Sequence, residues 1–158
     1  MGDWRRHEAA GTLIRGVDHI GLIAPQELES LGLYSDLGFR DCAQGVAVGY
    51  GVRCRFMRHS NVKLEIVSPD RAGSVVDGDL ARRGPGLHHI AFEVDDLPAE
   101  TDRLRKAGLT VIDPEPQPGA LPDMEVCFLH LGRGSGLLIE LVHYGDGAGG
   151  GTAMETKC

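Results

Sequence analysis

The chain has 158 residues, of which 42% are hydrophobic and 25% are charged, and its formal net charge is −7 at pH 7. These values are ordinary for a soluble globular protein, and the length allows one good core or two small half-domains of similar build. The negative charge disfavours nonspecific binding to nucleic acid or to an anionic membrane. No apolar run approaches the roughly 20 residues of a bilayer span and the start lacks a secretory signal, so the cytoplasm is the expected location.

Short apolar strands alternate with helical segments along the chain. Strands are predicted at residues 17–24, 62–68, 87–94 and 136–143. A helix is predicted at 26–38, closed by Gly38, and another at 96–107, with Asp96 as its N-cap and a glycine after its end. Residues 74–84 predict a short linking helix.

The two ends of the chain are expected to be disordered. Residues 145–158 are rich in glycine and nearly free of large apolar side chains, so burial cannot offset their ordering entropy. Residues 1–13 are expected to form a similar arm. A single domain is expected over residues 14–144, with one module at 14–69, a linker at 70–85 and a second module at 86–144.

The two modules repeat one pattern. Each reads β-α-β-β-β, and each has a histidine in its first strand and a glutamate in its last strand. The four residues in question are His19, Glu65, His89 and Glu140.

Side-chain alternation places these four residues on one face of a sheet. Successive side chains of a strand point to opposite faces, and the aliphatic neighbours, such as Ile20 and Ile66, lie opposite the polar residues. Helices must cover the aliphatic face, so the four polar side chains should point to the uncovered, concave side. His88 falls on the aliphatic face and is expected to pack against a helix.

Two imidazoles and two carboxylates in one cavity suit a single divalent ion such as zinc, nickel, cobalt, manganese or iron. Without a cation the two glutamates would repel each other, and one would take up a proton. A lone histidine or glutamate is more commonly a core or solvated residue, but their recurrence in matched strands favours the metal site. The four cysteines show no spacing typical of a thiolate metal site.

The segments "VDHIGLIA", "KLEIVSP", "GPGLHHIAFEVDDL" and "VCFLHLGRGSGLLIELV" resemble the vicinal oxygen chelate superfamily of glyoxalases, bleomycin resistance proteins and dioxygenases. Within it they are most similar to the methylmalonyl-CoA epimerase family. The resemblance implies an α+β fold in which paired βαβββ modules form a half-open, eight-stranded barrel-like sheet with helices on its convex side. It also implies a homodimer, and one divalent metal held by His19, Glu65, His89 and Glu140.

The resemblance further implies an enolate chemistry. In the epimerases the metal chelates the carboxylate and thioester oxygens of the substrate and stabilises the enolate formed when the α-proton is removed. Two carboxylates exchange that proton, and Glu140 resembles one of them. The implied substrate is a small anionic or thioester molecule.

The second proton-exchanging carboxylate is missing from its usual place. Spacing back from Glu65 puts Val48, Gly49 and Tyr50 where an epimerase would have two glutamates and a glutamine. Three residues are open as replacements, namely Asp41, Tyr50 and Glu125. The departure allows a diverged substrate, or a lyase or cyclase that uses the same enolate chemistry.

Two further functions are open. A glyoxalase I-type isomerase suits the same ligand set, and a non-catalytic binding or resistance protein would hold a small molecule without turning it over. The complete ligand set and an aromatic content of 5% disfavour the resistance protein. Arg53, Arg55 and Arg58 either meet an anionic substrate or form a solvated strand edge.

Overall fold

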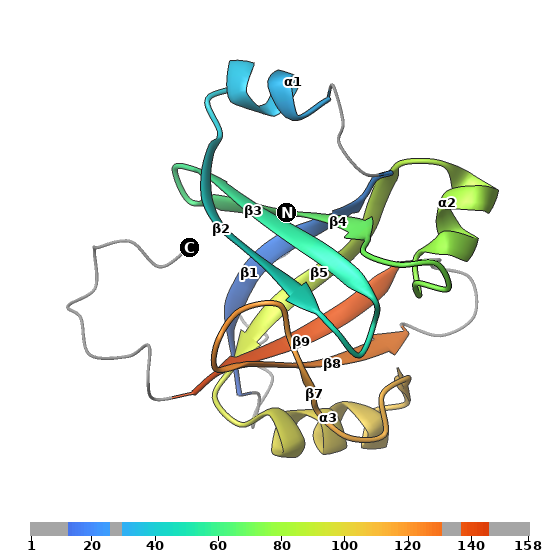
Figure 1. The fold of residues 1–158 in the computed structure, drawn as a ribbon. Coiled ribbons are helices and arrows are strands. Elements are labelled where there is room, and N and C mark those ends of the chain that lie inside the picture. The colour runs from blue at the N-terminus through green and yellow to red at the C-terminus, as the bar shows by residue number, and fades with distance from the viewer. Residues whose placement is uncertain (1–12, 26–29, 131–136, 146–158) are drawn as a thin grey trace, which may run out of the picture.

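A single curved sheet organises the chain in the computed structural model, which describes residues 13–25, 30–130 and 137–145 (Figure 1). Apart from Leu13 and Gly145, the expected arm and tail lie outside these described residues. The strands are β1 (Ile14–Ile23), β2 (Arg40–Ala47), β3 (Val52–His59), β4 (Val62–Pro69), β5 (Gly86–Val94), β6 (Thr110–Val111), β7 (Gln117–Pro118), β8 (Met124–His130) and β9 (Leu138–Tyr144). The helices are α1 (Ser30–Asp36), α2 (Asp77–Arg83) and α3 (Leu97–Lys106).

The strand order confirms the repeated module. The sheet runs β2-β3-β4-β1-β5-β9-β8-β6, with β7 paired to β8 beside that path. Strand β1 pairs in parallel with β4, and β5 pairs in parallel with β9, while β1 and β5 join the modules in antiparallel fashion. Read outward from the β1–β5 pair, both halves follow the same sequence of strands. The fold is therefore the expected α+β sheet of paired modules, left half-open because no pairing joins β2 to β6 among the described residues.

The sheet has nine strands where eight were expected, because the outer strand of the second module is divided. Strands β6 and β7 contain two residues each and both pair with β8. Pro114 and Pro116 lie between them. A proline has no N–H to donate to a strand ladder, so this segment cannot run as one continuous strand.

Helix α3 covers the convex face of the second module, as its sequence predicts. The Asp96 side chain accepts a hydrogen bond of 2.9 Å from the backbone N–H of Ala99 and caps the helix. Leu97 and Leu104 pack against Leu129 and other buried residues of β8 and β9. No helix among the described residues is long and apolar enough to cross a membrane.

Helix α1 is shorter than the predicted segment, and residues 26–29 of that prediction lie outside the described part of the chain. Leu33 of α1 and Leu37 just after it are 64% and 66% exposed. Linking helix α2 lies between the end of β4 and the start of β5, at the right of the view in Figure 1, and matches the short helix expected between the modules.

Apolar residues fill the concave side of the sheet as well as the convex side. Phe56 and Ala91 are fully buried in the concave layer, which continues through both modules. The two modules meet closely across this layer, because a side chain at Gly45 of β2 would overlap the backbone carbonyl of Ala120. The concave side of the sheet is therefore a depression lined by side chains of both modules.

Three register shifts interrupt the central strand pair, and two of them lie beside the histidines. In the ladder between β1 and β5 the register shifts after Val17 and again after Gly21, which leaves Asp18 and His88 without a cross-strand partner. A bulge breaks the two-residue alternation of side chains. His88 therefore does not lie on the convex, helix-covered face as expected: it lines the concave cavity beside His89, where its Nε2 lies 3.7 Å from Asp79 of the linking helix α2.

Truncating the convex core should destabilise the fold. Leu129 is fully buried under α3, so Leu129→Ala should lower the free energy of unfolding by about 2–5 kcal/mol. The matched control is Leu37→Ala, at an exposed position, which should change it by less than about 0.5 kcal/mol. Urea denaturation followed by circular dichroism measures both, and equal effects of the two substitutions would contradict this account of the core.

Candidate metal centre

The four residues selected from the sequence come together at the centre of the sheet. They lie on β1, β4, β5 and β9, the four strands around the junction of the modules. One ligand atom from each lies within 4.8 Å of the others, and each residue is at most 4% exposed. The residues are His19, Glu65, His89 and Glu140.

The side chains are too close together to be explained by hydrogen bonding. His19 Nε2 lies 3.2 Å from Glu65 Oε2, 3.0 Å from Glu140 Oε2 and 3.1 Å from His89 Nε2. A ring nitrogen carries at most one proton, so it can satisfy one of these neighbours. Glu140 Oε2 is buried and receives no hydrogen bond of adequate geometry. This set of nitrogen and oxygen atoms around one point fits a divalent cation.

The residue before each histidine orients it. Asp18 Oδ2 lies 2.7 Å from His19 Nδ1, and His88 Nδ1 lies 2.9 Å from His89 Nδ1. A proton held on Nδ1 leaves the lone pair of Nε2 facing the centre, which is the tautomer that a metal ligand needs. Both orienting residues are the bulge residues of the β1–β5 pair. The sequence reasoning missed these roles, although an aspartate and a histidine in matched positions of the repeat were a visible signal.

Asp18, which hydrogen-bonds to His19, forms a buried ion pair with Lys63. Lys63 Nζ lies 2.8 Å from Asp18 Oδ2, and the Tyr144 hydroxyl donates a hydrogen bond of 3.2 Å to the same oxygen. Burial would raise the pKa of Asp18, but its hydrogen bond to His19 and the charge of Lys63 hold it below the usual value. Because Lys63 balances Asp18, the two glutamates remain as the uncompensated charges of the site, and one dication would neutralise them.

In the metal-free protein the pKa values of both cluster histidines are raised. Burial opposes the charged ring of His89, but the carboxylates of Glu140 and Glu65 outweigh it and raise its pKa to about 9. The same forces raise the pKa of His19, and both imidazoles lower the pKa of the two glutamates against the effect of burial. Burial and the charge of His89 lower the pKa of His88 to about 4, so this ring is neutral at pH 7.

The metal-free protein should lose stability at alkaline pH. Protonation of His89 stabilises the folded state fully below its unfolded-state pKa of 6.5, and this contribution disappears as the pH rises through about 9. The free energy of unfolding of chelator-treated protein should fall by on the order of 3 kcal/mol over that range. A bound dication replaces the proton, so the metal-loaded protein should show a much smaller fall. Urea titrations at a series of pH values test this, and a flat profile for the metal-free protein would contradict it.

Close packing holds the His89 ring in place. A side chain at Gly21 on the neighbouring strand would overlap that ring. We expect Gly21→Ala to displace His89 and to weaken zinc binding at least about 10-fold, as measured by calorimetry. Gly32→Ala is the control, because a methyl group there meets no atom within 4 Å. Unchanged zinc affinity in Gly21→Ala would show that the His89 ring is not part of the site.

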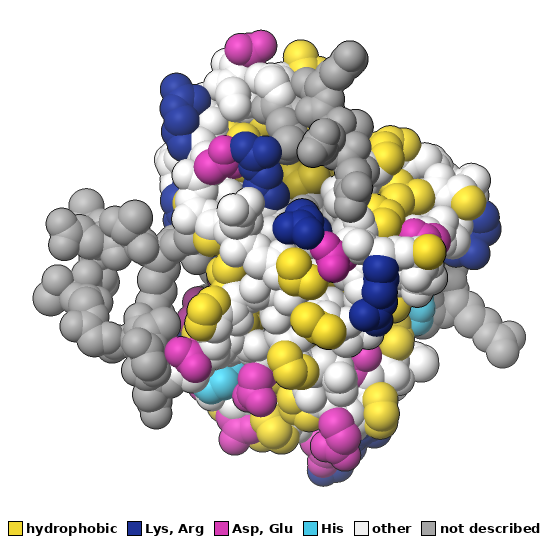
Figure 2. Space-filling model, viewed as in Figure 1, with side chains coloured by type: hydrophobic (Ala, Val, Ile, Leu, Met, Phe, Trp, Pro, Cys, Tyr) yellow, Lys and Arg dark blue, Asp and Glu magenta, His cyan; other side chains and the backbone are white. Residues whose placement is uncertain are grey.

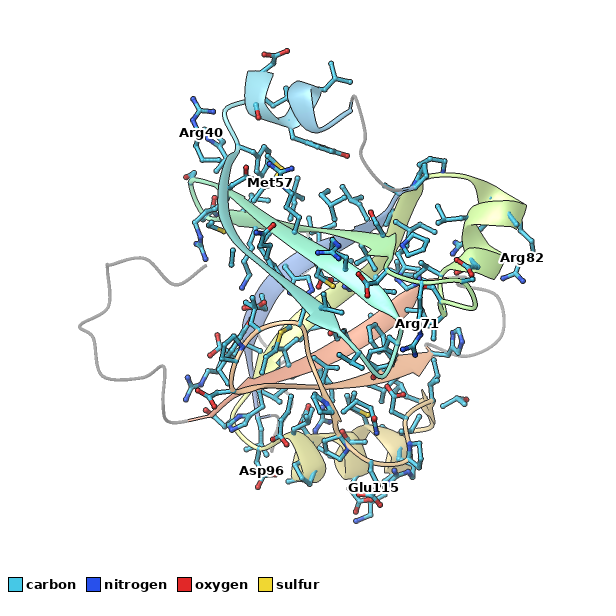
Figure 3. All side chains as sticks on the ribbon, in the orientation of Figure 1. Arg40, Met57, Arg71, Arg82, Asp96 and Glu115 are labelled. Carbon is cyan, nitrogen blue, oxygen red and sulfur yellow. The ribbon has the colours of Figure 1, made fainter. Side chains whose placement is uncertain are left out.

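A cavity of about 340 Å³ opens beside the cluster. Glu65, His89 and Glu140 form part of its floor, and its walls are largely apolar side chains of both modules. Arg82 of α2, labelled in Figure 3, stands with Asp79 at its exposed mouth, and the two residues pair with each other. The cavity can therefore hold a small molecule against the cluster, between walls that are largely apolar.

Of the three residues open as a second base, one lines this cavity, namely Tyr50. Asp41 lies on the edge strand β2 and pairs with Arg55, and Glu125 is exposed on β8. The Tyr50 hydroxyl donates a hydrogen bond of 2.9 Å to Asp113 Oδ2, and Asp113 also lines the cavity. Asp113 follows a two-residue strand, and no sequence pattern marks it as a cavity residue.

The arginines of β3 do not face the cavity. Arg53 pairs with Asp70 at 2.6 Å, and Arg55 pairs with Asp41, both with partly exposed side chains. Acidic and basic side chains are interspersed over the face shown in Figure 2. These two side chains are solvated, as the second interpretation expects, but they lie on an inner strand between β2 and β4 and not at a sheet edge.

The fold and the cluster define a class of protein. The sequence model of the glyoxalase/bleomycin resistance protein/dioxygenase superfamily matches residues 18–128. The chain belongs to this superfamily, as its motifs indicate.

Similar proteins narrow the class. The chain is 33% identical over 132 residues to the ethylmalonyl-CoA/methylmalonyl-CoA epimerase of Cereibacter sphaeroides, covering 82% of this chain and 98% of that protein. It is 32% identical over 127 residues to the mitochondrial methylmalonyl-CoA epimerase of Dictyostelium discoideum, covering 79% of this chain and 76% of the relative.

Solved structures agree with these relatives. The methylmalonyl-CoA epimerase of Mycobacterium tuberculosis superposes with a TM-score of 0.77 at 29% identity, over 89% of this chain and 95% of that one. A Streptomyces coelicolor methylmalonyl-CoA epimerase variant in complex with 2-nitronate-propionyl-CoA gives a TM-score of 0.74 at 29% identity, over 83% and 98% of the two chains. This chain is a methylmalonyl-CoA epimerase-like member of the superfamily.

Proposed function

We propose that this protein is a metal-dependent epimerase of methylmalonyl-CoA or a closely related acyl-CoA thioester. His19, Glu65, His89 and Glu140 would hold one divalent ion, and Glu140 would also move the α-proton. The observation that carries the proposal is the convergence of these four buried side chains on the floor of an apolar cavity. The similarity to CoA-thioester epimerases supports the choice of substrate.

Each part of the site has a task in this reaction. A divalent ion supplies Lewis acidity that stabilises negative charge on the thioester oxygen. Asp18 and His88 fix the imidazoles so that the ligand nitrogens face the centre. Glu140 has two carboxylate oxygens, so one can face the ion while the other accepts a proton from the substrate. The largely apolar walls would surround the enolate with few competing polar groups.

Zinc, nickel, cobalt, manganese and iron all accept this set of two nitrogen and two oxygen donors. A glyoxalase I-type isomerase and a non-catalytic binding protein are the alternatives, and each would need a different ligand in the same cavity. The four buried donors favour an enzyme over a binding protein, because a binding protein has no need to bring two carboxylates together without water. Homodimer formation and a cytoplasmic location stay predictions from the sequence and from family resemblance.

Deuterium exchange tests the proposal. Metal-loaded protein incubated with methylmalonyl-CoA in D₂O should introduce deuterium at the α-carbon, as measured by mass spectrometry. Glu140→Gln keeps an oxygen for the metal but cannot accept a proton, so exchange should fall at least about 100-fold while metal content is kept. Glu125→Gln, at an exposed position outside the cavity, is the control and should exchange at the wild-type rate. Absence of exchange with each of the five metals would exclude this substrate class.

A further inference from the structure

Epimerisation needs proton transfer at both faces of a planar carbon. If the proposed function holds, Glu140 removes or delivers the α-proton at one face of the enolate. A carboxylate fixed on one strand cannot reach the other face of a substrate held against the cluster. Inversion therefore requires a second group that lines the cavity and exchanges protons, and the inference below rests on the proposed function.

Few polar side chains of the described cavity lining can fill this role. Asp79 and Arg82 pair with each other at the mouth, and Asp79 also pairs with Arg83. His88 is bonded to the ring of His89 and is committed to orienting it. Burial and the adjacent carboxylate of Glu65 raise the pKa of the Cys54 thiol, which disfavours its deprotonation.

Glu65 belongs to the same cluster as Glu140, so the Tyr50–Asp113 pair is the candidate that lies away from the cluster. Tyr50 lies in the turn between β2 and β3, and Asp113 follows β6, so each module supplies one member. Asp113 Oδ2 accepts hydrogen bonds from the Tyr50 hydroxyl at 2.9 Å and from the backbone N–H of Phe128 at 2.7 Å. These two bonds fix both side chains at the cavity wall.

The Phe128 ring sets the position of Tyr50 relative to the cluster. It makes an edge contact with the Tyr50 ring, with centroids 5.5 Å apart, and another with the His89 ring at 5.4 Å. Tyr50 thus stands one aromatic ring away from the cluster, while Glu140 belongs to the cluster itself. Tyr50 and Glu140 both line the cavity, so a substrate held there can contact both residues.

We propose that Tyr50 relays a proton between the α-carbon and Asp113. The α C–H bond breaks, and its proton forms a new O–H bond to the Tyr50 oxygen. The original hydroxyl proton of Tyr50 passes to Asp113 Oδ2 in the same step. The electron pair of the C–H bond stays with the substrate as the enolate, so one negative charge moves from Asp113 to the substrate. The reverse steps deliver a proton to that face of the carbon.

The relay explains why both residues are needed. Burial and the neighbouring Asp113 carboxylate raise the pKa of Tyr50 above its usual range, so the hydroxyl stays protonated and is no base by itself. The Tyr50 hydroxyl can accept the α-proton because it releases its own proton to Asp113 in the same step. Asp113 acts as the base, and Tyr50 is the residue that contacts the substrate.

The test measures inversion and exchange separately for each epimer of methylmalonyl-CoA in D₂O. In Tyr50→Phe the hydroxyl is gone, so inversion should fall at least about 100-fold. Exchange with retention should persist for the one epimer whose α-proton faces Glu140. Asp113→Asn should lose inversion to the same extent as Tyr50→Phe. The asparagine side-chain oxygen can still accept the hydrogen bonds from Tyr50 and Phe128, but it cannot take up a proton. Zinc affinity and the Michaelis constant should stay within about threefold of wild type in both variants.

Three outcomes would overturn the relay. The first is inversion near the wild-type rate in either variant, and the second is an equal loss of inversion and exchange of both epimers, which indicates a structural role. The third is a wild-type protein that exchanges neither epimer, which contradicts the proposed function and removes the relay with it. Tyr34→Phe, in α1 and outside the cavity lining, is the matched control and should keep inversion unchanged.

Discussion

Two glutamates buried beside two histidines form the constraint on which the rest of the structure depends. In a low-dielectric interior a pair of carboxylates is tolerated only if positive charge lies between them. The imidazoles supply it as protons in the metal-free protein, and a dication bound by the four side chains would supply it instead. The four side chains come from the four central strands, whose ladders hold them on both sides. A rigid sheet centre keeps the donors converged, although their mutual charge would drive them apart.

The two modules place chemically different partners in equivalent positions. Each module has a bulge residue directly before its histidine, and each bulge residue binds the histidine at Nδ1. In the first module that residue is a carboxylate tied to Lys63, and in the second it is a neutral imidazole. The two cluster histidines therefore have chemically different partners even though the backbone repeats.

The cavity is likewise built from unequal halves. One side is the cluster, whose Glu65 and Glu140 both line the cavity. The other side combines a turn of the first module with a segment of the second, held together through the Tyr50–Asp113 hydrogen bond. The close approach of Gly45 to Ala120 brings the edges of the modules near enough for this contact. A repeated fold can in this way serve a reaction whose two proton transfers differ.

The sequence by itself determined the repeated module, helix α3 and the four cluster residues. Each of these follows from local rules, since strand alternation selects a face, and an aspartate cap followed by helix formers and a glycine defines a helix. Only the tertiary structure decided the role of His88, because a bulge depends on the pairing of two strands far apart in the chain. It also decided the partnership of Tyr50 with Asp113, 63 positions away. That contact exists because the two modules close on one cavity, and no pattern within either segment carries information about the other.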